Sequence, residues 1–195
     1  MRAAVRLPRG WSLPPAWYVG LAAAVGAQRL REVALSRRNS RRLRGRRAAA
    51  GTYPFMVAAH IGLCTLPLVE VAARRRRSRV PLFWVGVLGA ATALRLWSIK
   101  TLGSTWNIRS VVPDDVQPVT GGPYRFVRHP NYLAVSLEFL ALPLAGGAVW
   151  TAAGLSLANA VVLWDRVRAE ERLLAEVPGY EEAFRGRPRF IPGVF

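Results

Sequence analysis

The sequence has few of the side chains that bind metals or form covalent intermediates. Its single cysteine, Cys64, lies in an apolar run, so no intramolecular disulfide can form. The two histidines, His60 and His129, are too few for a multi-histidine iron site, and no Cys/His set has zinc-site spacing. A glycine-rich dinucleotide fingerprint and the local signature of a Ser-His-Asp triad are also absent. These absences predict no metal site and favour chemistry that depends on positioning the reactants more than on a strong base.

Acidic residues are scarce in a chain that is otherwise rich in charged and apolar side chains. The 195 residues include 28 Lys and Arg but only 11 Asp and Glu, which gives a formal net charge of +17, and 52% are hydrophobic. A soluble domain of this length would crowd many arginines onto a small surface, whereas a membrane protein places them in its loops. The basic residues separate apolar runs and do not line one face, so we expect no nucleic-acid binding.

Five apolar segments approach the length of about 20 residues that a helix needs to cross a bilayer. They cover residues 11–28, 52–73, 80–99, 132–149 and 151–164. The last two are short and meet at Gly146-Gly147, which indicates a tight helical hairpin. The N-terminal segment resembles a signal peptide, but the later apolar segments favour its retention as a first membrane helix. We therefore predict an all-α integral membrane bundle of about five transmembrane helices.

The arginines predict the orientation of these spans. Nine of them lie between the first and second segments, and the positive-inside bias places that loop, the loop after the third span and the C-terminal tail in the cytoplasm. The arginines at residues 74–77 would then lie outside, against the bias, but the opposite orientation would place more arginines there. We expect a multi-pass protein of the cell membrane whose arginine-rich loops contact anionic lipid headgroups.

Two polar segments border the apolar runs on this cytoplasmic side. Residues 101–131 are rich in Gly and Pro. Residues 165–195 begin with "DRVRAEERLLAEV", which has the periodicity of an amphipathic helix, with Val167, Leu174 and Val177 among its apolar positions. Pro178-Gly179 is expected to end that helix. The chain thus divides into N-terminal spans, residues 1–100, and a second region, residues 101–195, that holds most of the polar motifs.

Three stretches of the second region carry a family resemblance. They are "LGSTWNIRSVV", "TGGPYRFVRHPNYL" and "RVRAEERLL", the last followed by "PGYEEAFRGRPRFIPGV". Together, in this order and spacing, they resemble the isoprenylcysteine carboxyl methyltransferase family, whose members are integral membrane enzymes that use S-adenosylmethionine. The resemblance covers about half of the chain, from Leu102 onward. It implies that the connector and the C-terminal helix form the cofactor site in the catalytic region, residues 101–195.

The resemblance implies roles for individual residues. Cofactor binding falls on Val116, Gln117, Val119, Tyr124, His129, Pro130, Asn131, Tyr132 and Glu170. Glu170 is the first glutamate of the EE pair, and Arg166, four residues earlier, is implied to contact the methyl acceptor. Both are candidate catalytic residues. A glutamine that eukaryotic relatives use has no clear counterpart, because the alignment slips near Pro113, and Gln117 is the substitute that the sequence offers.

These residue types suit methyl transfer, in which alignment of the two reactants supplies much of the catalysis. Tyrosine rings attract a cationic sulfonium through cation–π contacts. Arg166 offers a planar and permanently charged group that can orient an acceptor carboxylate. Helical spacing places Arg166 and Glu170 one turn apart on the same face. An ionised carboxylate acceptor needs no general base, whereas a phenol with a pKa of about 10 does.

Simpler interpretations stand beside these roles. Arg166 and Glu170 have the spacing of an ordinary helical ion pair, and residues 122–132 also suit an interfacial loop. Glu138 lies within the fourth span, where a charge is costly, so it is either a substrate-binding base or a partner of Arg95. For His60 and Glu70, contacts in helix packing or with headgroups are expected more than catalysis.

We interpret the chain as a membrane methyltransferase that uses S-adenosylmethionine and a lipophilic acceptor with a carboxylate or phenolic oxygen. The arginine- and alanine-rich composition indicates a high-GC bacterium, where a prenylcysteine is not the expected acceptor. A membrane-partitioning phenol, quinol or lipid carboxylate fits better. Two alternatives remain, an NADPH-dependent membrane reductase of related architecture and a non-enzymatic membrane scaffold.

Overall fold

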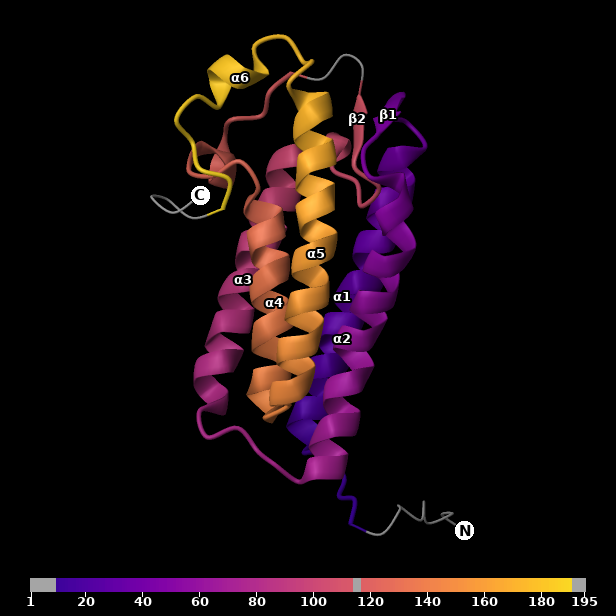
Figure 1. The fold of residues 1–195 in the computed structure, drawn as a ribbon, viewed down its shortest axis with the longest axis vertical. Helices are drawn as coiled ribbons and strands as arrows, with labels where there is room; N and C mark the ends of the chain where they lie inside the picture. Colours follow the sequence, from indigo (N-terminus) through magenta and orange to yellow (C-terminus); the bar gives the residue numbers. More distant parts are fainter. Residues whose placement is uncertain (1–9, 114–116, 191–195) are drawn as a thin grey trace.

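The computed structural model describes residues 10–113 and 117–190, and it is mostly helical, as the sequence predicts. Its five long helices stand side by side in one elongated bundle (Figure 1). They are α1 (Ala16–Ser40), α2 (Tyr53–Arg74), α3 (Pro81–Leu102), α4 (Pro130–Gly146) and α5 (Val149–Leu174). The shorter elements are β1 (Gly45–Arg47), η1 (Ala50–Thr52), η2 (Gly103–Thr105), β2 (Val111–Pro113), η3 (Gly122–Arg125) and α6 (Tyr180–Ala183).

The five long helices differ in how well they suit a bilayer. Within the described part of the chain, α2 and the stretch Pro81–Thr105 that contains α3 are long and apolar enough to cross a membrane by length and composition. Helix α4 has only 17 residues, and α1 and α5 become strongly charged in their second halves. The apolar runs therefore predicted the number and order of the long helices, and two of these helices have the length and composition of a membrane span.

Helices α1 and α5 extend well beyond the apolar segments that predicted them. Helix α1 continues to Ser40, and its charged second half buries Glu32, Ser36 and Asn39 at helical spacing. The expected separate amphipathic helix is instead the continuation of α5, which runs without a break to Leu174. Polar residues that hydrogen-bond to other elements support these extensions. The apolar segments of the sequence therefore underestimated the length of both helices.

A two-stranded antiparallel sheet joins two loops that are distant in the sequence. Strand β1 pairs with β2 in the register Gly45↔Pro113, Arg46↔Val112 and Arg47↔Val111. Gly45 is required there, because an added Cβ would lie 2.1 Å from the carbonyl oxygen of Val112. The pairing holds the arginine-rich loop after α1 against the connector between α3 and α4. The sequence did not predict it, because each strand has only three residues.

The core of the bundle lies between α1, α2, α3 and α4. Tyr18, Leu63, Phe139 and Leu142 are fully buried in it, and the Tyr18 hydroxyl donates to the Leu142 carbonyl at 3.0 Å. An added Cβ at Gly146 would lie 2.3 Å from the Tyr18 ring, so α4 and α1 can pack this closely only with glycine there. Helix α4 ends at Gly146, and the turn into α5 follows at once, as the Gly-Gly pair predicted.

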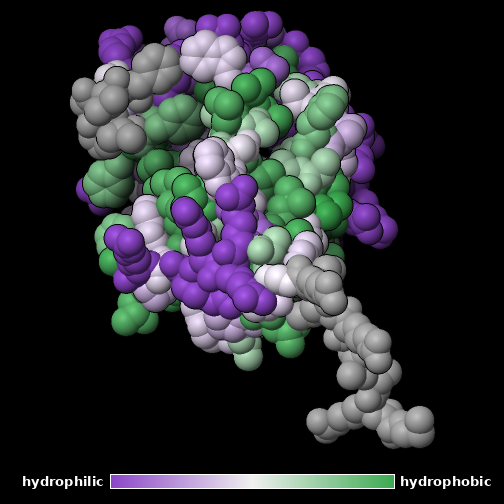
Figure 2. Space-filling model, turned by 60° about the horizontal axis from the view of Figure 1, so that its bottom comes forward, coloured by the Kyte–Doolittle hydropathy of each residue, from purple (hydrophilic) through white to green (hydrophobic). Residues whose placement is uncertain are grey.

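The two ends of the bundle are different (Figure 1). The connector between α3 and α4, the β1–β2 sheet and the segment after α5 gather at one end, which we call the cap. The opposite end carries exposed arginines at residues 74–77 and 79. Figure 2 shows a hydrophilic patch on this opposite end of the molecule. Arg77 donates there to the carbonyls of Val71 and Leu13, so part of this charge holds the end of α2 to the N-terminal segment.

Candidate active site

A cavity of about 590 Å³ extends from the cap into the bundle. All five long helices contribute to its lining, together with the connector and the segment after α5. Seven residues that the resemblance assigns to the cofactor line this single cavity. They are Gln117, Val119, Tyr124, His129, Asn131, Tyr132 and Glu170. Two polar segments from distant parts of the sequence therefore meet at one place.

One described residue that the resemblance assigns to the cofactor, Pro130, is not part of the cavity lining. Pro130 is buried at the first position of α4, where its missing N–H leaves no helix hydrogen bond unmade. It begins the helix that carries Asn131 and Tyr132. Val116 lies outside the described residues.

A chain of hydrogen bonds connects Glu170 to Arg166. The Tyr132 hydroxyl donates to Glu170 Oε2 at 2.5 Å and lies 3.2 Å from Ser110 Oγ. Arg166 Nη2 donates to the same Ser110 oxygen at 2.6 Å and to the Ile108 carbonyl at 2.7 Å. The simpler alternative, an ion pair between Arg166 and Glu170, is not among the ion pairs of the described residues, and Tyr132 and Ser110 bridge the two side chains instead. Ser110 has φ +48, a rare conformation that holds its hydroxyl between them.

Arg166 is buried without a full set of partners. The residue is 2% exposed, and its Nε and Nη1 atoms have no hydrogen-bond partner within the described residues. A buried guanidinium left in this state is costly, because the charge loses its hydration. Arg166 lines the cavity, so an anion placed there would complete its hydrogen bonds.

The second glutamate of the EE pair has a different function from the first. Both oxygens of Glu171 accept from Arg189 Nε at 2.9 Å, and His129 Nε2 lies 3.2 Å from Oε1. Burial opposes ionisation of Glu171, but these hydrogen bonds outweigh it and lower its pKa to about 2. We call His129, Glu171 and Arg189 the C-terminal latch. Backbone bonds from Arg128 N to Pro188 O and from His129 N to Arg189 O reinforce it.

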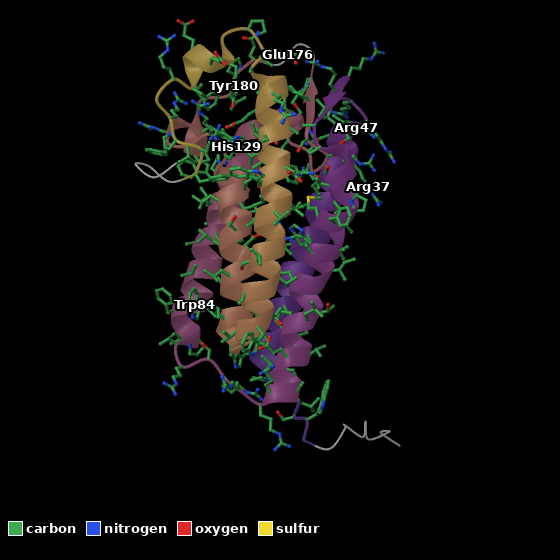
Figure 3. All side chains as sticks on the ribbon, in the orientation of Figure 1. Arg37, Arg47, Trp84, His129, Glu176 and Tyr180 are labelled. Carbon is green, nitrogen blue, oxygen red and sulfur yellow. The ribbon has the colours of Figure 1, made fainter. Side chains whose placement is uncertain are left out.

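The segment held by the latch forms a wall of the cavity. Tyr180 and Phe184 line it and pack against Tyr124, and Figure 3 shows Tyr180 and His129 at the cap. Burial, followed by the nearby Glu170 carboxylate, raises the pKa of both Tyr124 and Tyr180, so both phenols stay neutral. Tyr180 and Phe184 were not identified from the sequence, because a tail beyond the last helix carries no local sign that it folds back.

A buried group of four charges lies deeper in the bundle. Arg95 donates to both oxygens of Glu32, from Nε at 2.9 Å and from Nη2 at 2.7 Å. Arg29 donates to Glu32 at 2.7 Å and to Glu138 at 2.6 Å. These four residues, which we call the inner charge cluster, connect α1, α3 and α4 and have no net charge.

The inner charge cluster corrects what the sequence indicated for Glu138. Its hydrogen-bond partner is Arg29 and not Arg95, which pairs with Glu32 instead. Glu138 is 1% exposed, and it is absent from the cavity lining, whereas Arg29, Glu32 and Arg95 belong to that lining. The carboxylate thus lies behind Arg29, which the sequence did not identify because a loop arginine and a helical arginine look alike.

Glu70 and His60 of α2 both contact other helices of the bundle. Glu70 accepts from the backbone N–H groups of Trp150 and Thr151 and from the Thr151 hydroxyl, so it caps the first turn of α5. His60 lines the cavity and packs edge-on against Phe139. No cluster of three or more potential metal ligands is present in residues 10–113 and 117–190.

The chain is similar to known proteins over the region that forms most of this site. Residues 84–176 match the isoprenylcysteine carboxyl methyltransferase (ICMT) family. The chain is 32% identical over 162 residues to the uncharacterized protein YpbQ of Bacillus subtilis (strain 168), covering 80% of this chain and 95% of that protein.

Two more distant relatives bear names from metal resistance. The cobalt-zinc-cadmium resistance protein CzcN of Cupriavidus metallidurans is 33% identical over 114 residues, which are 57% of this chain and 49% of that protein. The nickel-cobalt-cadmium resistance protein NccN of Alcaligenes xylosoxydans xylosoxydans is 31% identical over 114 residues, 57% of this chain and 50% of that protein. This chain therefore spans about half the length of these two. With the family match over residues 84–176 and the likeness that covers 80% of this chain and 95% of the Bacillus protein, the chain belongs to the isoprenylcysteine carboxyl methyltransferase family.

Proposed function

We propose that this protein is a multi-pass membrane enzyme that transfers a methyl group from S-adenosylmethionine to an acidic oxygen of a lipophilic acceptor. Membership of the family makes it a membrane methyltransferase in general terms. The cofactor, the acceptor class and the multi-pass topology are the proposal. The observation that carries it is the cavity that joins the residues assigned to the cofactor to a buried and incompletely paired Arg166.

The surface of the bundle supports insertion of all five helices. Each carries at least one large apolar side chain that is exposed outside the cavity, namely Trp17, Val69, Leu82, Leu140 and Leu157. Exposed apolar side chains on every helix of the bundle suit contact with lipid. The cap then lies in the cytoplasm, because the exposed arginines of residues 37–47 are at that end. Arg77, which donates to the Leu13 carbonyl of the N-terminal segment, accounts for part of the charge on the outer side.

The residues at the cap fit S-adenosylmethionine. Glu170 can accept hydrogen bonds from hydroxyl or ammonium groups, and the buried Asn131 Oδ1 has no hydrogen-bond partner within the described residues. The neutral rings of Tyr124 and Tyr180 present aromatic surface to a cation. When bound, the cofactor supplies an electrophilic methyl group on a sulfonium sulfur, and that sulfur keeps the bonding electron pair when the acceptor oxygen takes the methyl.

Arg166 orients the acceptor in this proposal. Its Nη2 atom is fixed by Ile108 and Ser110, so the remaining N–H groups of the guanidinium have a set direction for an anion. A carboxylate arrives ionised at neutral pH and needs no base. A phenol must lose its proton, and a guanidinium beside the oxygen favours the phenolate. The position of Arg166 thus supports an acceptor with an acidic oxygen, either a carboxylate or a phenol, and the experiment below distinguishes the two.

The proposal is tested with purified protein in detergent. Calorimetry compares binding of S-adenosylmethionine with that of NADPH, and labelled methyl transfer into lipids extracted from the organism that makes the protein identifies the product. We expect Glu170→Ala to weaken cofactor binding about tenfold or more and Arg166→Ala to lower turnover about 10- to 100-fold with cofactor affinity retained. Arg168→Ala is the matched control, because Arg168 is exposed on the same helix over the Trp164 ring.

Three results would overturn the proposal. Binding of NADPH in place of S-adenosylmethionine would favour the reductase alternative. Binding of neither would favour the scaffold. Unchanged methyl transfer in both the Glu170 and the Arg166 variants would remove the proposed site.

A further inference from the structure

The cavity has a second polar level deeper in the bundle than Arg166. On α5 the residues that line the cavity include Asn159, Leu163, Arg166 and Glu170, which are spaced so that they share one face of the helix. Asn159 precedes Arg166 by seven residues, which corresponds to about 10 Å along a helix axis. The apolar Leu163 lies between them. The cavity wall thus has two polar positions separated by an apolar one.

Asn159 is the polar residue of this deeper level on α5. It is 3% exposed and lines the cavity, yet its side chain forms no hydrogen bond to any residue in the described part of the chain. None of its polar atoms belongs to the fully enclosed, unpaired atoms of the described residues, so the carboxamide is open to the cavity space. This group offers both a donor and an acceptor to whatever occupies the cavity.

His60 supplies a second polar group at the same height. Helices α2 and α5 are antiparallel, because Glu70 bonds to Thr151 and an added Cβ at Gly62 would lie 3.4 Å from Leu155. Eight residues along α5 from Thr151 reach Asn159, and eight residues back along α2 from Glu70 reach Gly62. His60 is therefore within one turn of the level of Asn159.

The orientation of the His60 ring is set by the backbone. His60 Nδ1 lies 2.8 Å from the Met56 carbonyl oxygen, and since a carbonyl can only accept, Nδ1 carries the proton. In the neutral ring this leaves Nε2 as an acceptor. Because His60 also lines the cavity, the deeper level combines an imidazole acceptor with an amide that both donates and accepts.

The surrounding charges favour a neutral group at this level. Arg29, Glu32 and Arg95 line the cavity near His60, but the two arginines are matched by Glu32 and Glu138. An additional anion or cation would unbalance a cluster that has no net charge, and it would do so in apolar surroundings. A hydroxyl or a carbonyl satisfies Asn159 without adding charge.

We propose that Asn159 and His60 form a second subsite that binds a neutral oxygen of the acceptor, about 10 Å from the oxygen that is methylated at Arg166. This inference rests on the proposed function. The acceptor is accordingly a lipophilic molecule with two polar groups, an acidic oxygen and a hydroxyl or carbonyl, joined by an apolar spacer about as long as eight methylene groups. A simple fatty acid or a phenol with a plain alkyl chain lacks the second group.

The experiment compares wild-type protein with Asn159→Leu in labelled methyl transfer into lipids extracted from the organism that makes the protein. The labelled product is analysed by fragmentation mass spectrometry. We expect the wild-type product to contain an oxygen besides the methylated group at that spacing. We expect Asn159→Leu to raise the KM for this acceptor about tenfold while its affinity for S-adenosylmethionine stays unchanged. Ala158→Leu is the control, since Ala158 is the exposed neighbour on the lipid-facing side of α5.

The outcomes separate this inference from the proposed function. A wild-type product with no second oxygen, or an Asn159→Leu variant with an unchanged KM, overturns the second subsite alone. Absence of any methylated product with the wild type removes the proposed function and the subsite together.

Discussion

The inner charge cluster and the C-terminal latch are both networks of charged side chains, but they lie in different surroundings. Arg95 and Glu32 of the cluster have side chains that are 5% exposed. In the latch, Glu171 is 15% exposed and Arg189 is 40% exposed. A charge released from the cluster would remain in apolar surroundings, whereas a charge released from the latch meets water. We therefore expect the cluster to fix the bundle, whereas the latch holds the C-terminal segment against the cavity through more exposed contacts.

The largest expected effect comes from breaking the inner charge cluster. Arg95→Leu leaves Glu32 with one guanidinium partner in the bundle, and we expect the free energy of unfolding to fall by about 3–5 kcal/mol. Denaturant or thermal unfolding in detergent measures this loss. A double change, Glu32→Leu with Arg95→Leu, should recover part of it, because the buried carboxylate is removed as well.

The exposed ion pair between Arg46 and Glu176 provides the control for this effect. Both side chains are 58% exposed, so Glu176→Gln should change the free energy of unfolding by less than about 1 kcal/mol. Equal losses at the two places would contradict the distinction between buried and exposed networks.

A smaller effect is expected when the latch is weakened. Glu171→Gln removes the charge that accepts from Arg189 and lies beside His129. After allowance for solvent screening, we expect the free energy of detaching the C-terminal segment from the bundle to fall by about 1–2 kcal/mol. The loss should be local, with faster proteolysis after residue 175 and several-fold faster release of S-adenosylmethionine at unchanged global stability. If the variant instead loses global stability as Arg95→Leu does, the latch belongs to the fixed part of the fold.

The smallest effect concerns pH. The pKa of Glu171 is lowered to about 2 from an ordinary value near 4.5. Its contribution to holding the C-terminal segment is therefore fully present above pH 4.5 and disappears as the pH falls toward 2. We therefore expect the proteolysis rate of the C-terminal segment to change little through titration of Glu171 between pH 5 and pH 8. A proteolysis rate that rises several-fold as the pH falls from 8 to 5, and that no longer does so in Glu171→Gln, would contradict the lowered pKa of Glu171.

The difference between the two networks also explains what the sequence could predict. Apolar runs predicted α2 and α3 to within a few residues, because apolar content alone determines where those helices lie. The second halves of α1 and α5 depend on polar contacts such as Asn39 with the Trp106 carbonyl, 67 residues away. Hydrophobicity does not reveal a contact of that kind, so both helices were predicted too short.

In the candidate site, too, the sequence predicted some residues and missed those that depend on contacts between distant parts of the chain. The family resemblance brought together Tyr124, His129, Tyr132, Arg166 and Glu170, and the structure places all five on one cavity. Ser110, which bridges two of them, depends on a left-handed backbone conformation that its sequence context does not signal. Arg29 and Asn159 owe their positions to the packing of several helices. Such positions can be found only once the heights of the helices relative to one another are known.

The unbroken course of α5 has a consequence for the acceptor site that we propose. One helix carries both Asn159 and Arg166, so in that proposal the number of residues between them sets the length of the acceptor. A relative with one turn more or less in this interval would select a longer or shorter molecule with the same chemical groups.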